Sequence, residues 1–181
     1  MNNKGFKTID IVYAGAAAAV IAVCSWIYIP VGAVPVTLQT LAVCLTAALL
    51  GTKRGTLAVF IYILLGAVGV PVFSGFKGGI GALLGATGGY IIGFIFTALI
   101  VGIASDKTKK PAFCALAMVT GVLVCYAFGT AWFALIYMRD GKPTSLYSIL
   151  SICVIPFIIP DAVKILVAAV ISQKIKKFVK N

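Results

Sequence analysis

Long apolar stretches separated by short polar segments fill most of the chain, and their lengths predict membrane-spanning helices. A spanning helix needs about 20 predominantly apolar residues. Four stretches meet that need, at 9–29, 84–104, 112–138 and 146–175. Because further apolar runs follow the first stretch, we expect it to be a first transmembrane helix rather than a cleaved signal peptide.

The remaining apolar stretch, 36–70, is interrupted by Lys53 and Arg54, with a glycine on either side. Paired charges between glycines indicate a turn. We therefore expect a tight hairpin of two short helices, 36–50 and 55–68, since short spans are tolerated inside a bundle or where the bilayer thins. The prediction is an all-α membrane protein with six transmembrane helices.

The composition agrees with one lipid-covered domain over residues 1–181. Apolar residues make up 62% of the chain and charged residues 10%, whereas a soluble domain has roughly 45–50% and about 25%. The formal charge is +11. On a soluble protein this charge would suggest nucleic acid, but here the bases lie in short loops and at the chain ends, where membrane topology requires them. No nucleic-acid partner is expected.

The basic residues are divided unequally between the two sides of the predicted bundle. The side with both chain ends and the second and fourth loops carries eleven, and the other side carries three. Since basic loops stay in the cytoplasm, we expect a multi-pass protein of the cell membrane with both termini cytoplasmic. The eleven are Lys4, Lys7, Lys53, Arg54, Lys107, Lys109, Lys110, Lys174, Lys176, Lys177 and Lys180, and the three are Lys77, Arg139 and Lys142.

The five cysteines indicate neither a disulfide framework nor a metal site. They form no CxxC pair, lie in apolar stretches and have no histidine to accompany them. We therefore expect small buried side chains, and neither a metal nor a cofactor.

Asp161 and Lys164 are a charged pair within the last predicted span. Either charge alone would cost at least about 2.5–3.5 kcal/mol at bilayer depth. Their i, i+3 spacing places both on one helix face, and Pro156 and Pro160 free backbone carbonyls nearby. Such a polar spot indicates a ligand site that faces the bundle interior. The alternative is a structural ion pair near the membrane surface.

A glycine-rich segment, 69–89, holds eight glycines in 21 residues and also Lys77. So many glycines disfavour a helix at its start. Irregular backbone at membrane depth must be covered by protein or line a cavity, so we expect an outward-facing cavity where Lys77 contacts a polar ligand. A flexible external loop is the alternative. The segment lacks both the GxxxxGK[ST] pattern and the dinucleotide spacing, which excludes nucleotide binding there.

Uncharged polar residues, Thr37, Gln39 and Thr40, begin the second predicted helix beside the same outer face. Gln39 can offer donors and an acceptor to a ligand or, alternatively, a hydrogen bond between helices. In the first helix, Ala14 and Ala18 stand four residues apart. A face of such small residues lets another helix approach closely.

These residues, in this order, resemble the BioY family, the biotin-specific substrate-binding component of energy-coupling-factor (ECF) vitamin transporters. The matching stretches cover most of 34–93 and also 156–164. They read VPVTLQTLAVCLTAALLGTKRGTLAVFIYILLGAVGVPVF, GGIGALLGATGGYIIGF and PFIIPDAVK. Two positions depart from the family pattern: Ala86 stands where proline is usual, and Pro160 where glycine is usual.

The resemblance implies a six-helix bundle with an outward-facing pocket for biotin. It also implies partners, a transmembrane coupling protein and two ATPases, and Ala14 and Ala18 occupy the place of the helix face that docks on the coupling protein. For the cyclic urea of biotin, we expect Asp161 to accept a hydrogen bond from an N–H, and Lys164 to neutralise Asp161 and to reach the urea oxygen or another acceptor. Further ligand contacts are expected from Gln39, Thr87, Tyr90, Phe73 and Lys77.

Two other classes of function compete with this one. A stand-alone ion-coupled carrier of a small vitamin-like solute would use Asp161 as its titrating group. A membrane enzyme would need a nucleophile with a base or a metal. The chain has no His, no Glu and only one carboxylate that we expect to be buried, so an enzyme is not expected.

Overall fold

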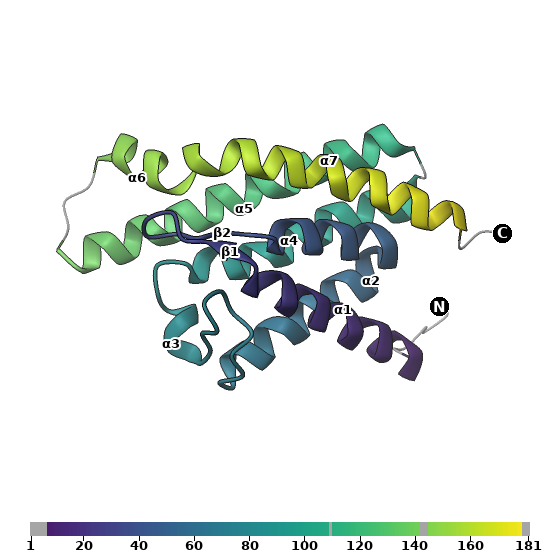
Figure 1. Cartoon of the computed structure of the whole chain (residues 1–181), viewed down its shortest axis with the longest axis horizontal. Helices are drawn as coiled ribbons and strands as arrows, with labels where there is room; N and C mark the ends of the chain where they lie inside the picture. Colours follow the sequence, from purple (N-terminus) through teal and green to yellow (C-terminus); the bar gives the residue numbers. More distant parts are fainter. Residues whose placement is uncertain (1–6, 109, 142–144, 179–181) are drawn as a thin grey trace, which may run out of the picture.

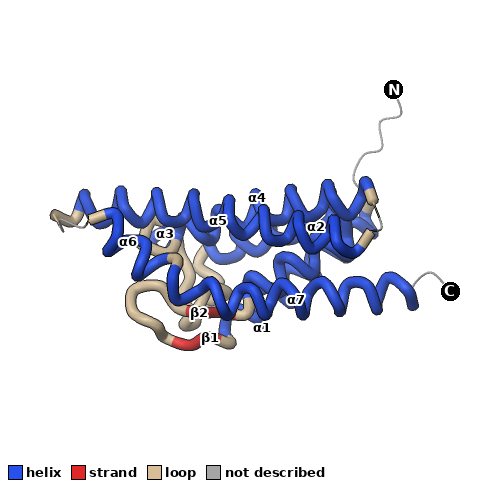
Figure 2. Tube along the Cα trace, turned by 90° about the horizontal axis from the view of Figure 1, so that it is seen from above, coloured by secondary structure: helices blue, strands red, loops and turns tan. Residues whose placement is uncertain are grey.

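The computed structural model describes residues 7–108, 110–141 and 145–178, which form a bundle of long helices (Figure 1). Seen from above in Figure 2, the long helices again run side by side along the longest axis. The elements are α1 (Thr8–Trp26), β1 (Tyr28–Ile29), β2 (Val36–Thr37), α2 (Gln39–Ala67), α3 (Ile80–Leu83), α4 (Gly88–Lys107), α5 (Pro111–Arg139), α6 (Leu146–Cys153) and α7 (Ile155–Phe178). Four lysines of the predicted charge asymmetry lie outside the described residues: Lys4, Lys109, Lys142 and Lys180.

Among the described residues, five helical segments are long and apolar enough to cross a membrane: α1, α2, α4, α5 and the run from α6 into α7. Their outer faces expose large hydrophobic side chains, for example Leu116 and Leu135 on α5 and Ile159 and Leu166 on α7. Surfaces of this kind suit lipid rather than water. The predicted class, an all-α bundle of long apolar helices, is confirmed.

The reversal predicted near Lys53 and Arg54 lies within α2. The backbone leaves helical geometry at Gly51, with φ 74° and ψ −175°, a conformation that glycine adopts without steric cost. A Cβ built on Gly55 would lie 2.8 Å from the Cα of Ala47. Residues eight apart in a straight helix are about 12 Å apart. The chain therefore folds back at Gly51, and the two basic residues belong to the second half of α2 rather than to a loop.

Polar contacts tie this reversal to the helix ends around it. Asp106 of α4 accepts hydrogen bonds from the backbone N–H and the hydroxyl of Thr52, at 3.0 and 2.6 Å. Arg54 donates to Asp10 of α1 at 2.6 Å, and Lys176 of α7 donates to a serine hydroxyl of α4 at 2.8 Å. The start of α1 and the end of α7 thus lie at the same end of the bundle as the reversal (Figure 1).

Several helix ends differ from the expected ones, each for a local reason. α1 stops early, at Trp26, because Tyr28–Ile29 pairs antiparallel with Val36–Thr37. The last predicted helix is divided at Val154, where Pro156 cannot donate a backbone N–H to the preceding turn. α4 starts later than predicted because the glycine-rich chain before it forms only the single turn of α3.

Small residues let the helices approach one another closely. A Cβ on Gly93 of α4 would lie 2.9 Å from the Sγ of Cys125, and one on Gly121 of α5 would lie 3.1 Å from the backbone of α4. Ala14 and Ala18 are 0% and 1% exposed. These two alanines, which we expected on a face open to a partner, instead pack inside the bundle because α1 turns this side toward its neighbours.

Candidate ligand-binding site

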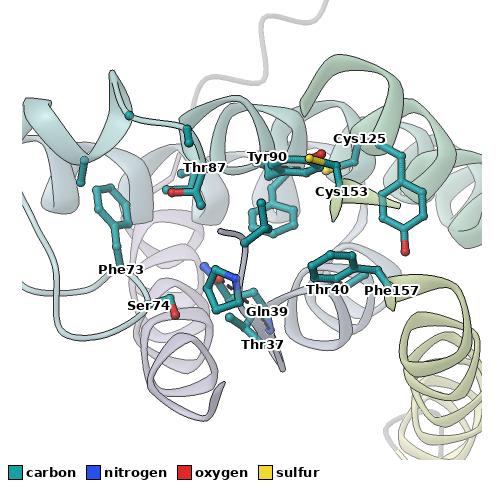
Figure 3. Close-up of a pocket in the computed structure, with 18 of the residues that line it drawn as sticks. Thr37, Gln39, Thr40, Phe73, Ser74, Thr87, Tyr90, Cys125, Cys153 and Phe157 are labelled. Atoms are coloured by element: carbon teal, nitrogen blue, oxygen red, sulfur yellow. Dashed lines mark hydrogen bonds between the residues drawn. The ribbon is translucent and has the colours of Figure 1, made fainter. Parts of the chain in front are cut away.

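A cavity of about 610 Å³ lies between the helices, in the size range of roughly 300–1,000 Å³ that small-molecule sites have. Its walls come from α2, α4, α5, α6 and α7, together with the loops that precede α2 and α4. Figure 3 shows polar and aromatic side chains of these elements converging on one space. Segments far apart in the sequence therefore meet here.

Asp161 and Lys164 of α7 form a buried ion pair on the wall of this cavity. Lys164 Nζ donates to Asp161 Oδ1 at 2.7 Å, and the two residues are 7% and 4% exposed. Tyr126 of α5 donates to the other carboxylate oxygen, Oδ2. The pair faces the cavity inside the bundle, and its role in ligand binding stays a prediction.

The helical period of α7 explains why the pair points inward. Phe157, Asp161 and Lys164 are all buried and recur at the spacing of one helix face, whereas Ile159 and Val163 are exposed on the opposite face. Pro160 lies inside the helix directly before the aspartate and has no N–H to donate to the turn before it. The carbonyl of Pro156, four residues earlier, therefore receives no backbone hydrogen bond from Pro160.

Gln39 lines the cavity, is 5% exposed and is engaged within the protein. Its Nε2 donates to the hydroxyl of Tyr62 at 2.6 Å, and its Oε1 accepts from the hydroxyl of Thr37 at 3.0 Å. The hydrogen bond between helices, which the sequence left as an alternative, is therefore present. It joins the two halves of α2, because Tyr62 lies beyond the reversal at Gly51.

The glycine-rich loop contributes Phe73 and Lys77 to the cavity wall. Phe73 is 2% exposed, packs against Gly66 and meets the ring of Tyr62 edge-on, with centroids 5.5 Å apart. The chain then turns back so that Lys77 lies beside Phe73, and the Phe73 N–H donates to the Lys77 carbonyl at 2.9 Å. The lysine side chain is exposed, and among the described residues it has no hydrogen bond or ion pair.

The start of α4 brings Thr87 and Tyr90 to the same cavity (Figure 3). Thr87 is the residue that caps the helix, and its carbonyl accepts from the Tyr90 N–H at 3.1 Å. The Tyr90 hydroxyl lies 3.0 Å from the hydroxyl of Thr130 on α5. The structure therefore brings all seven ligand-contact residues predicted from the sequence to one cavity.

Other residues of the wall were not predicted, chief among them Tyr126, Cys125 and Cys153. Tyr126 is 35 positions away from Asp161 in the sequence, so no local spacing connects the two. The available signal was weaker: a tyrosine in an apolar span needs a partner for its hydroxyl. The five cysteines are free; four are buried, as expected, and Cys24 is partly exposed, while Cys125 and Cys153 also border the cavity.

Comparison with known proteins places this site in a family. The family model described as BioY matches the chain over residues 1–181. The chain belongs to the BioY family. A biotin transporter of Thermotoga maritima is 43% identical over 169 residues, which cover 93% of this chain and 96% of the relative. A probable biotin transporter of Pyrococcus horikoshii is 40% identical over 150 residues, which cover 83% and 85%.

The same fold is present in a solved structure, the S-component for biotin from an ECF-type ABC transporter. It matches with a TM-score of 0.82 and 28% sequence identity, over 98% of this chain and 94% of that one. The resemblance stated from the sequence is confirmed. As a member of the BioY family, this chain is a multi-pass membrane protein of a transporter family, not an enzyme.

Proposed function

We propose that this BioY chain is the membrane-embedded biotin-binding component of an ECF-type transporter and that partner ATPases energise biotin uptake. The observation that carries the proposal is the buried Asp161–Lys164 pair on the wall of a cavity of about 610 Å³. The relatives supply the ligand, since one is a biotin transporter and the other a probable biotin transporter. A buried acid and base facing a cavity suit an uncharged polar head group.

The pair matches the cyclic urea of biotin. A urea presents N–H donors and one carbonyl acceptor. Asp161 accepts from an N–H with lone pairs that Lys164 and Tyr126 leave unused, and Lys164 donates to the carbonyl with an N–H not committed to Asp161. A ligand without the urea would forgo the charge-assisted hydrogen bonds that these groups can still form, and this favours biotin over apolar molecules of its size.

The rest of the ligand meets other parts of the wall. Phe73 covers the sulfur-containing ring, and Gln39, Thr87 and Tyr90 add polar contacts. Lys77, a cation without an ion pair among the described residues, is the partner proposed for the valerate carboxylate.

In the membrane, we propose six crossings, with α2 contributing two. The reversal at Gly51 supports this count, as do the described bases near it. Both termini then lie in the cytoplasm. The loops bordering the cavity, between β1 and β2 and before α3, lie toward the opposite end from the start of α1 (Figure 1), which supports a pocket that opens outward.

The proposed partners are a transmembrane coupling protein and two ATPases, named by analogy with the ECF-type relative. Docking through α1 remains part of the proposal, with one change in the residues. Ala14 and Ala18 are buried, so a partner helix would meet the neighbouring small residues Gly15 and Ala19, of which Ala19 is exposed and Gly15 has open space around it.

Biotin titration of the detergent-purified chain tests the proposed function. We expect saturable binding, and a folded chain that binds no biotin would contradict the proposal. Biotin uptake into liposomes distinguishes an ECF-type transporter from a stand-alone ion-coupled carrier. Accumulation that needs the coupling protein and ATPases supports the ECF assignment, whereas ion-driven accumulation by the chain alone would indicate a secondary carrier.

A further inference from the structure

Tyr126 joins the acid–base pair of α7 to the α5 wall of the cavity. Its hydroxyl donates to Asp161 Oδ2, while Lys164 donates to Oδ1. The residue is half-buried, and its ring packs against both groups of buried hydrophobic side chains that form the core. The position of Tyr126 is therefore set by the core of the bundle rather than by α7.

The two partners of Asp161 differ in what they can hold in place. Lys164 lies on the same helix as Asp161, three residues later, so it moves together with the aspartate and cannot fix the carboxylate relative to the opposite wall. Tyr126 lies on another helix and can do so. An ionised carboxylate only accepts hydrogen bonds, so the phenol proton is committed to Asp161.

We propose that Tyr126 is a positioning residue for ligand binding: it holds Asp161 Oδ2 against α5, so that the remaining lone pairs of the carboxylate face one urea N–H of the ligand. The proposal rests on the biotin-binding function proposed above. Pro160 gives this role a physical reason, because a helix that lacks a backbone hydrogen bond directly before Asp161 is less rigid there. The bond from α5 compensates for that lost restraint.

Tyr90 provides a comparison within the same cavity wall, since its hydroxyl does not contact Asp161. It lines the same cavity and is also partly buried, but its hydroxyl pairs with Thr130 on α5 at 3.0 Å and not with α7. Tyr90→Phe and Tyr126→Phe each remove one phenol oxygen from the cavity wall. Only the second substitution releases Asp161.

The experiment measures the affinity of the full-length chain, in one detergent, for three ligands. These are biotin and two lactam analogues, in each of which one urea N–H is replaced by a CH₂ group. Tyr126→Phe should weaken biotin binding about 10-fold, the factor for a hydrogen bond to a charged group. Tyr126→Phe should also weaken, by a similar factor, the binding of the lactam that keeps the N–H donating to Asp161. The other lactam has no N–H that can donate to Asp161, so the substitution should weaken its binding by less than about 3-fold.

A purely structural tyrosine gives a different result. If Tyr126→Phe weakens the binding of all three ligands by the same factor, the positioning role is overturned. A wild-type chain that binds none of the ligands refutes the biotin function itself, which is a separate outcome.

A second measurement covers the case in which Tyr126→Phe does not fold. Solid-state NMR on the wild-type chain can follow the separation of Tyr126 Cζ and Asp161 Cγ with and without biotin. A hydrogen bond keeps these carbons within about 4.5 Å. We expect that separation to persist with biotin bound, and the two residues moving apart on binding would overturn the proposal.

Discussion

Replacing Lys164 with methionine would leave Asp161 as a buried carboxylate without its ion-pair partner. Asp161 is 4% exposed, and of the two hydrogen-bond donors that the described residues give it, the Tyr126 hydroxyl alone would remain. Removing one member of a buried pair costs roughly 3–5 kcal/mol of folding stability. The double variant Asp161→Asn/Lys164→Met removes both charges, so it should regain most of that loss.

Biotin affinity should not recover together with stability. If Asp161 and Lys164 each make one charge-assisted hydrogen bond to the urea, worth roughly 1.5–3 kcal/mol, their joint removal costs about 3–6 kcal/mol of binding. That corresponds to a rise in Kd of roughly 10²- to 10⁴-fold. The double variant should therefore be folded and stable but nearly unable to bind biotin.

Thermal unfolding without ligand and biotin titration, both in the same detergent, measure the two effects on wild-type, single and double variants. Lys176→Met is a matched control, because Lys176 is also on α7 and hydrogen-bonded but lies away from the cavity. A double variant as unstable as Lys164→Met would refute the unpaired-charge argument. A double variant with wild-type affinity would refute the role of the pair in binding.

Three further predictions concern other parts of the chain. Gly51→Ala should lower the melting temperature, because φ 74° costs an L-residue about 1–2 kcal/mol and the new Cβ would collide with Asp106, whereas Gly15→Ala, with open space around it, should not. Lys77→Ala should weaken biotin about 5-fold, as expected for an exposed ion pair, and leave the affinity for biotin amide unchanged; equal losses would contradict the carboxylate contact. Arg54→Ala should cost about 1 kcal/mol or less, since the arginine side chain is 37% exposed, and a larger loss on thermal unfolding would show that this pair is not a surface one.

The pairing of Asp161 with Lys164 could be predicted because it depends only on residues close together in the sequence. The spacing of Asp161 and Lys164 decides that they share a helix face, and the cost of charge in lipid decides which way that face points. The reversal at Gly51 could also be predicted, because glycines flank the basic residues Lys53 and Arg54. The side of α1 that faces the bundle could not be predicted, because small residues occupy both sides of that helix. The buried Ala14 and Ala18 therefore could not be distinguished from Gly15 and Ala19.

Contacts between distant segments account for most of what the sequence did not predict. Tyr126 could have paired with many groups. Its hydrogen bond to Asp161 exists because the packing of α5 against α7 brings these two residues side by side. The bond from Gln39 to Tyr62 likewise depends on how α2 folds back. The ends of α1 and α4 were misplaced because a two-residue β-pairing and one glycine-rich turn replace helix where hydropathy remains high.

The polar side chains of the cavity wall find most of their partners within the protein. Its principal polar side chains pair with one another: Gln39 with Tyr62, Tyr90 with Thr130, and Asp161 with Lys164 and Tyr126, while Ser74 alone keeps a buried hydroxyl without a partner among the described residues. Apart from the Ser74 hydroxyl, a ligand therefore uses spare lone pairs and N–H groups rather than pairing with groups that lack a partner. For an analogue that lacks one hydrogen bond to an uncharged group of the wall, such as Gln39, discrimination should then be about 2- to 13-fold, the net worth of a neutral bond, and not the 10⁴-fold of a site left with unpaired groups.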